Sequence, residues 1–150
     1  MNDKARCSVN AQMLDRIYKN VKMGSDSMIN IMSRVKDREL RQELTDQLAR
    51  YEEYSDQAER MIRELGTDAR EEGLITRLSA KIELTMNTMT DTSTSHLAQT
   101  LIESTTASMT DMTRIVREYE NAPCSEDALK LARKIAEFED KSIENLKKFL

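Results

Sequence analysis

Residues 37–65 read DRELRQELTDQLARYEEYSDQAERMIREL, and their apolar side chains follow a seven-residue repeat. The members of this repeat, which share one side of an α-helix, are Leu44, Tyr51, Ala58 and Leu65. Seven-residue spacing is typical of helices that pack side by side in a left-handed bundle. Asp37 is suited to cap the start of this helix and Gly66 to end it. The stretch therefore predicts one long helix of a helical bundle.

Three further stretches of similar length carry a helical apolar stripe, at about 8–35, 93–121 and 125–150. A shorter stripe covers about 69–90. Ser125 is followed by two acidic residues, a pattern that favours the start of a helix. We expect four long helices, each roughly 40 Å long at about 1.5 Å per residue. Together with the shorter helix they would form a single domain that spans residues 1–150.

The run TDTSTS at residues 90–95 separates the shorter helix from the next long one. Thr, Asp and Ser favour caps and turns over helix interiors, and the apolar stripes on either side differ in direction by roughly 100°. We therefore predict a turn or sharp kink at this point. The shorter helix would then return the chain along the bundle. The predicted fold is an all-α, ferritin-like four-helix bundle with a helical crossover between the second and third long helices. A five-helix array is the alternative.

The composition limits the cellular compartment that we expect for the protein and the classes of molecule that it could bind. Charged residues make up 33% of the chain but give a net charge of only -4, and no basic stripe suited to nucleic acid is present. No run of roughly 18 uncharged apolar residues suggests a membrane span. Cys7 and Cys124 lie far apart and form no CxxC pattern, which argues against a zinc site. We expect a cytoplasmic protein with two free thiols that binds neither nucleic acid nor membranes.

Three segments carry a resemblance to a known class of proteins: residues 18–27 (YKNVKMGSDS), 94–103 (TSHLAQTLIE) and 136–146 (AEFEDKSIENL). They resemble segments of small bacterial ferritin-like bundle proteins of uncharacterised function, and the resemblance implies the fold while leaving the function open. Metal-binding ferritins are identified by a Glu on the first helix and by Glu-x-x-His pairs. This chain contains no Glu-x-x-His, and its one histidine, His96, falls on the polar face of its helix. Iron storage and oxidase activity are therefore not expected.

Polar and small residues interrupt the apolar stripes at about half height of the four long helices. They are Gly24, Ser25, Tyr51, Tyr54, Ser104, Thr105, Ser108, Glu139 and Ser142. One interpretation is a structural hydrogen-bonded layer in which a tyrosine hydroxyl donates to Glu139, with Gly24 leaving room for a tyrosine ring. A second is a small-molecule or cation site formed by Tyr51, Tyr54, Ser108, Glu139 and Ser142. A third is a stripe displaced by one position, which would put Glu139 at the solvent boundary.

The remaining candidates for metal-binding or catalytic residues give little support for either role. His96 and Glu103 share a face but lie two turns apart, about 10 Å along the helix, too far to hold one metal unaided. No nucleophile has a histidine base in reach. We therefore expect a non-enzymatic bundle without cofactor or metal, acting through contacts with an unidentified protein partner and forming a homo-oligomer. Met109 and Val116, at the margin of their stripe, leave a dimer contact open. The alternative is a degenerate ferritin-like binder of a metal or small ligand in the mid-bundle layer.

Overall fold

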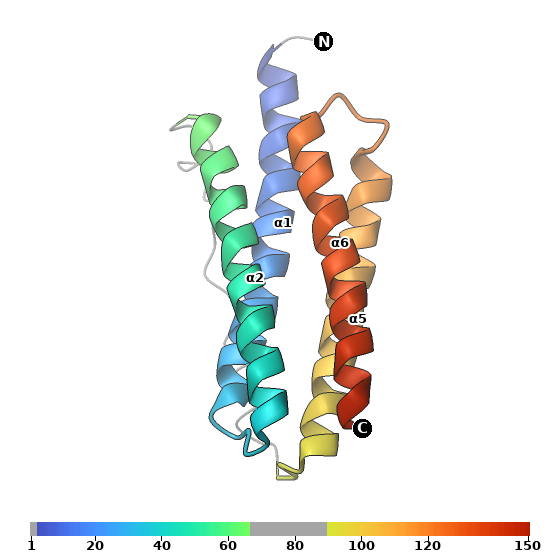
Figure 1. The fold of residues 1–150 in the computed structure, drawn as a ribbon. Coiled ribbons are helices and arrows are strands. Elements are labelled where there is room, and N and C mark those ends of the chain that lie inside the picture. The colour runs from blue at the N-terminus through green and yellow to red at the C-terminus, as the bar shows by residue number, and fades with distance from the viewer. Residues whose placement is uncertain (1–2, 67–89) are drawn as a thin grey trace.

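The computed structural model of the protein describes residues 3–66 and 90–150. These residues form four α-helices, α1 (Asp3–Met32), α2 (Arg38–Glu64), α5 (Thr94–Tyr119) and α6 (Glu126–Leu146), followed by the 3-10 turn η1 (Lys147–Phe149) (Figure 1). The predicted all-α class and the four long helices are confirmed. The shorter helix predicted over about 69–90, and with it the crossover, lies outside the described residues.

The helix starts follow the predicted capping residues. Asp37 accepts a hydrogen bond from the backbone N–H of Leu40 at 2.8 Å, and Ser125 accepts one from that of Ala128 at 3.4 Å. Residues 90–93 are not helical, and Ser93 caps α5, so the non-helical turn predicted before the fourth segment is confirmed over 90–93, whereas residues 94 and 95 already belong to α5. Gly66 follows α2 with φ +96, a conformation that glycine adopts without strain.

Three predicted helix ends differ from the structure. The first long helix was expected over about 8–35, whereas α1 spans Asp3–Met32. It starts earlier because a helix can extend beyond its apolar stripe. It stops earlier because the chain turns tightly after Met32, with the N–H of Arg34 bonded to the carbonyl of Ile31 at 2.8 Å. The last helix was expected to reach residue 150, but it ends as α-helix at Leu146 and tightens into η1.

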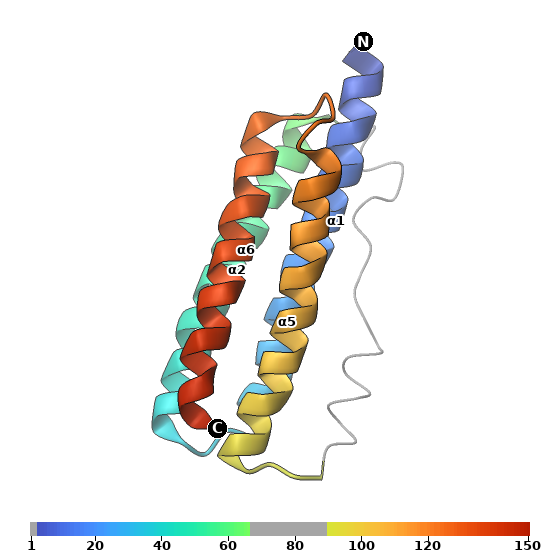
Figure 2. The same ribbon diagram turned by 90° about the vertical axis from the view of Figure 1, so that its right-hand side faces the viewer.

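Hydrogen bonds between helices fix the directions in which the four helices run. The N–H of Ser125 donates to the Asn10 side chain at 2.6 Å, so α1 and α6 begin at the same end of the bundle. The Asn145 amide donates to Glu43 at 3.4 Å, which joins the end of α6 to the start of α2. Arg16, in the first half of α1, donates to Glu118 near the end of α5, so these two helices are antiparallel as well. Helices α1 and α6 therefore run together, and α2 and α5 run against them (Figure 2). The expected parallel course of the first and last long helices is confirmed.

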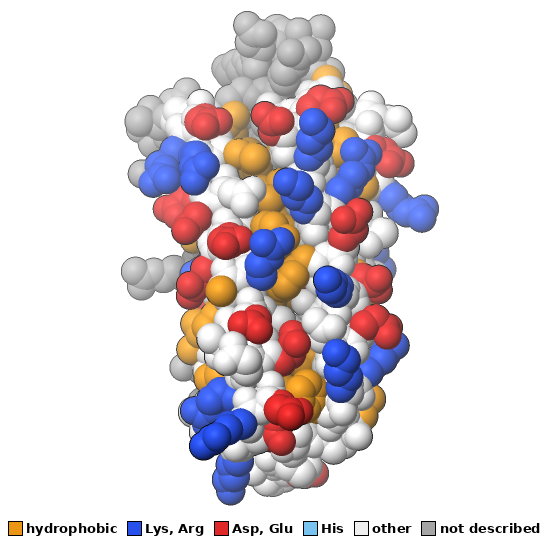
Figure 3. All heavy atoms as spheres, viewed as in Figure 1, with side chains coloured by type: hydrophobic (Ala, Val, Ile, Leu, Met, Phe, Trp, Pro, Cys, Tyr) orange, Lys and Arg blue, Asp and Glu red, His pale blue; other side chains and the backbone are white. Residues whose placement is uncertain are grey.

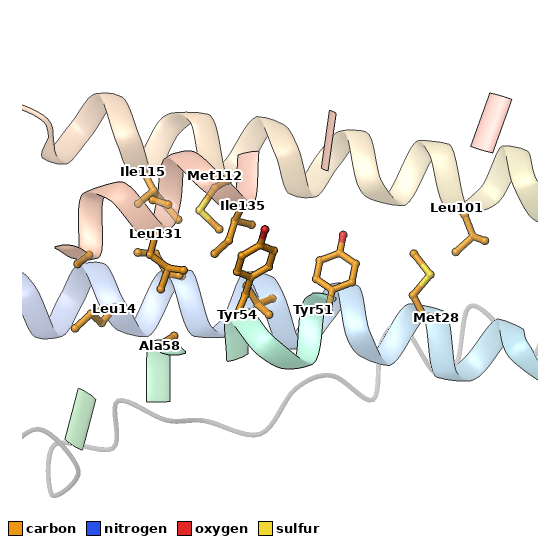
Figure 4. Close-up of a cluster of buried hydrophobic side chains, with 14 of the residues drawn as sticks. Leu14, Met28, Tyr51, Tyr54, Ala58, Leu101, Met112, Ile115, Leu131 and Ile135 are labelled. Atoms are coloured by element: carbon orange, nitrogen blue, oxygen red, sulfur yellow. The ribbon is translucent and has the colours of Figure 1, made fainter. Parts of the chain in front are cut away.

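The hydrophobic core lies along the axis between the four helices. Each helix contributes side chains that are fully buried, among them Ile17, Leu44, Leu101 and Ile135. Figure 4 shows these stripes converging from opposite helices. Burying one such side chain is worth roughly 1.5–3 kcal/mol, so the stripes supply most of the stability of the bundle. Ser104, predicted to point inward, is only half-buried at the margin of the α5 stripe. Within the described residues no helix is long and apolar enough to cross a membrane.

Candidate functional site

The ring of Tyr51 occupies the middle of the bundle and packs against Gly24. Tyr51 is fully buried, and a Cβ atom added at Gly24 would lie 2.5 Å from both Cε1 and Cζ of that ring. Only a residue without a side chain leaves room for the ring at this height. The edge of the Tyr51 ring also meets Phe138 of α6, with ring centroids 4.9 Å apart and an interplanar angle of 85°. Gly24 therefore has the role that its place in the sequence suggested.

Glu139 lies beside the Tyr51 hydroxyl with no exposed surface. The hydroxyl donates to Oε2 of Glu139 at 3.2 Å, while Oε1 has no hydrogen-bond partner among the described residues. The pKa of Glu139 is raised from 4.5 to about 8, mainly by burial; the Tyr51 hydrogen bond opposes this rise and the carboxylate of Asp111 adds to it. The carboxyl group is therefore largely protonated at neutral pH. Because it is buried, the interpretation that put Glu139 at the solvent boundary is wrong.

The pKa of Tyr51 is also raised well above 10. Burial is the main cause and the nearby Glu139 adds to it, while the Thr105 side chain lowers it. A phenol in this position stays protonated at any physiological pH and remains a hydrogen-bond donor. Tyr51, Thr105 and Glu139 thus form a small polar cluster in which neutral groups predominate near pH 7.

A second group of polar side chains joins α1 to α5 next to this cluster. The Asn20 amide, 4% exposed, donates to the backbone carbonyl of Ser108 at 2.9 Å and to Oδ2 of Asp111 at 3.3 Å. Its own carbonyl oxygen has no partner among the described residues. Ser108 accepts the Asn20 hydrogen bond with its backbone carbonyl. Asp111 links the two polar groups, because it accepts a hydrogen bond from Asn20 and also raises the pKa of Glu139.

Two of the predicted site residues face elsewhere. The hydroxyl of Tyr54 accepts a hydrogen bond from Arg50 at 2.8 Å, and the Arg50 guanidinium lies 5.2 Å from the centroid of the Tyr54 ring. The Tyr54 hydroxyl therefore lies next to an arginine on the outer side of α2. The hydroxyl of Ser142 donates to the Phe138 carbonyl of its own helix at 2.8 Å. Ser142 is buried but adds no side-chain bond to the layer. Of the five candidates, the structure brings together Tyr51 and Glu139, with Ser108 beside them through its main chain.

Among the buried amides that sequence reasoning missed are Asn20 and Gln47. Asn20 lies three residues after Ile17, and Gln47 three residues after Leu44, so both stand in phase with apolar stripes. Gln47 is 2% exposed and donates to Glu43 at 2.8 Å and to the Ser142 carbonyl at 3.5 Å. A polar residue in phase with a stripe was the available signal for both.

Imidazole and carboxylate groups do not gather anywhere in residues 3–66 and 90–150 in a set of three or more that could hold a metal ion. His96 is at the start of α5 with 38% of its side chain exposed, and its Nδ1 lies 3.9 Å from a carboxylate oxygen of Asp91. Glu103 accepts a hydrogen bond from Gln99 on the outer side of α5 at 3.1 Å. What the mid-bundle layer can do chemically is donate and accept hydrogen bonds through one neutral carboxyl and one phenol.

None of the protein-family models, curated proteins or solved structures compared with the chain matches it. The class that fold and site define is an all-α four-helix bundle with a hydrogen-bonded polar layer at its centre. Its function has to be inferred from the residues of this chain.

Proposed function

We propose that this protein is a metal-free, non-enzymatic ferritin-like bundle that works in the bacterial cytoplasm through protein contacts, as a homo-oligomer. One observation carries the proposal: the Tyr51 ring occupies the middle of the bundle, packed onto Gly24. Metal-binding ferritin-like proteins keep that height for carboxylates and imidazoles. A ring in this place, fitted to the glycine of α1, suits a bundle whose centre is structural.

The titratable groups support the same conclusion. A di-iron site needs about four carboxylates and two imidazoles directed inward, whereas Glu139 is the one fully buried carboxylate side chain of the described residues. Its raised pKa favours the protonated form, which is a poor metal ligand. The shared direction of α2 and α5 supports the ferritin-like arrangement, in which the second and third long helices run the same way. The free thiol of Cys124 suits a reducing compartment.

Native mass spectrometry of untagged protein from its own host cells, combined with elemental analysis, tests this proposal. We expect a defined oligomer of the chain without stoichiometric transition metal. A monomer at all concentrations would refute the self-association. Stoichiometric iron or manganese that is lost in Glu139→Gln, and kept in the exposed control Glu137→Gln, would refute the metal-free centre.

A second candidate function, binding of a cation or small amine in the mid-bundle layer, is favoured by two buried acceptors. Oε1 of Glu139 and Oδ1 of Asn20 have no hydrogen-bond partner among the described residues. Buried oxygens without partners are costly, and a bound cation or donor would satisfy them. The same mass-spectrometric experiment separates the candidates, since a bound species that depends on Glu139 supports this second function.

A further inference from the structure

A groove of about 600 Å³ runs along the outer side of the bundle between α2 and α6. These two helices pack more loosely against each other than the other adjacent pairs do. Figure 3 looks onto this face, where a seam of hydrophobic side chains is visible between rows of acidic and basic ones. Tyr54 and Phe138 line the groove together with the charged side chains. The face thus combines an apolar seam with charged walls.

The two walls of the groove carry opposite net charge. The α2 wall presents the acidic residues Glu43, Asp46 and Glu53. Its one basic residue, Arg50, is already held by Glu53 at 3.2 Å and by the hydroxyl of Tyr54. The α2 wall is therefore net negative.

The α6 wall presents Lys134 and Lys141 against a single acid, Glu137, and is net positive. Within the described residues no ion pair joins the two walls, since the ion pairs of these segments are local, between residues three apart in the sequence. Asp46, Lys134 and Lys141 therefore form no ion pair among the described residues, whereas Glu53 is paired with Arg50 of its own helix.

The heights of these charges along the bundle are fixed by a hydrogen bond between the two helices. Gln47 of α2 donates to the Ser142 carbonyl of α6, and the helices are antiparallel, so Asp46 and Lys141 differ in height by only about 3 Å. A step of seven residues along each helix brings Glu53 and Lys134 to the same small offset. An acid on one wall therefore has a lysine close to its own height on the other wall, at two successive levels.

We propose that this groove is the face through which a second copy of the chain binds, related by a two-fold axis parallel to the helices. Such an axis lays α2 of one copy on α6 of the other and keeps every residue at its own height. Asp46 then faces Lys141 of the partner subunit, and Glu53 faces Lys134 of the partner subunit. A two-fold axis across the helices would instead lay α2 on α2 and bring acids against acids, which is unfavourable.

A buried acceptor in the groove supports an occupied face. Gln47 is 2% exposed and lines the groove, and its Oε1 has no hydrogen-bond partner among the described residues. A donor from a bound surface would satisfy this oxygen. The α5 margin that the sequence suggested for a dimer is a weaker choice, because Met109 and Val116 are half-buried and Val116 packs against the core.

Charge reversal tests the face. This inference rests on the proposed self-association and assigns it a surface, so sedimentation velocity first asks whether the wild-type chain is a dimer. Reversing the α2 wall with Asp46→Lys and Glu53→Lys should raise the Kd of the dimer by about tenfold or more, and so should reversing the α6 wall with Lys134→Glu and Lys141→Glu. All four residues are exposed, so both variants should keep the helical signal of the wild type.

An equimolar mixture of the two reversed variants is the decisive sample. In this mixture the variant with the reversed α2 wall has two basic walls, and the variant with the reversed α6 wall has two acidic walls. The two-fold arrangement should therefore give a heterodimer with an affinity near that of the wild type. Reversing two exposed arginines of α5, Arg114→Glu and Arg117→Glu, is the control and should leave the dimer intact. A wild-type dimer that both reversed variants retain would overturn the assigned face and leave self-association standing. A monomeric wild type would overturn both.

Discussion

Glu139→Gln should change the pH dependence of stability in a direction that the buried carboxyl group dictates. The pKa of Glu139 is raised from 4.5 to about 8 in the folded protein. Below pH 4.5 the carboxyl is neutral in both the folded and the unfolded chain, so the stability it contributes is fully present. Between the two pKa values only the unfolded chain gives up its proton, and stability is lost as the pH rises through the folded value.

The magnitude follows from the same two pKa values. Each pH unit between 4.5 and about 8 lowers the free energy of unfolding of the wild type by about 1.4 kcal/mol through this one group. The whole interval amounts to about 5 kcal/mol. Glutamine does not titrate. At acidic pH the variant should be less stable by no more than about 1–2 kcal/mol, because the amide can still accept the hydrogen bond of Tyr51. Near neutral pH it should be the more stable protein.

Urea unfolding followed by circular dichroism, at pH values from about 4 to about 9, measures this difference. The matched control is Glu137→Gln on the same helix, where the side chain is exposed and the difference from wild type should stay flat with pH. A difference between Glu139→Gln and wild type that does not change with pH would refute the reasoning. So would a wild type that gains stability relative to the variant as the pH rises.

Three further substitutions test the contacts of the layer, each by the free energy of unfolding. Gly24→Ala should destabilise the protein by about 1–3 kcal/mol, because the added Cβ would meet the buried Tyr51 ring at 2.5 Å. In a Tyr51→Leu background that cost should disappear. An equal cost in both backgrounds would contradict the contact. Tyr51→Phe should cost about 1–2 kcal/mol and move the pKa of Glu139 still higher, since the hydroxyl lowers it; an unchanged pH midpoint would speak against this. Asn20→Leu should cost about 1–3 kcal/mol by leaving the Ser108 carbonyl without its donor, and a neutral or stabilising result would show that the buried amide is dispensable.

The parts of the fold that depend on periodicity could be predicted from the sequence. The repeat through Leu44 and Tyr51 set the buried side of α2, and the unfavourable glycine within a helical stripe indicated a close approach at Gly24. Helix starts at Asp37 and Ser125 followed from cap chemistry, which is local. These features depend on neighbours within one helix, and a single chain carries that information.

Contacts between helices could be predicted only in part. A hydrogen bond from Tyr51 or Tyr54 to Glu139 was one interpretation of the sequence, because all three fall at half height on inward positions, and the structure shows it for Tyr51. The turn of Tyr54 toward Arg50 was missed, because a rotamer choice at the edge of a stripe decides it and helical phase does not. Asn20 was missed for a similar reason, since its main partner is a backbone carbonyl of α5, which no side-chain pattern reveals. The pKa of Glu139 depends on the depth of burial, which the sequence bounds only loosely.

The central claim is that the middle of this bundle holds a neutral carboxyl group bonded to Tyr51 in place of a metal. The most direct test is a carbon-13 NMR titration of the side-chain carboxyl groups, with the Glu139 signal assigned by its loss in Glu139→Gln. The account predicts a midpoint of about 8 that added iron or manganese leaves unchanged. A midpoint near 4.5, or a signal that shifts to the ionised form when metal is added at neutral pH, would contradict it.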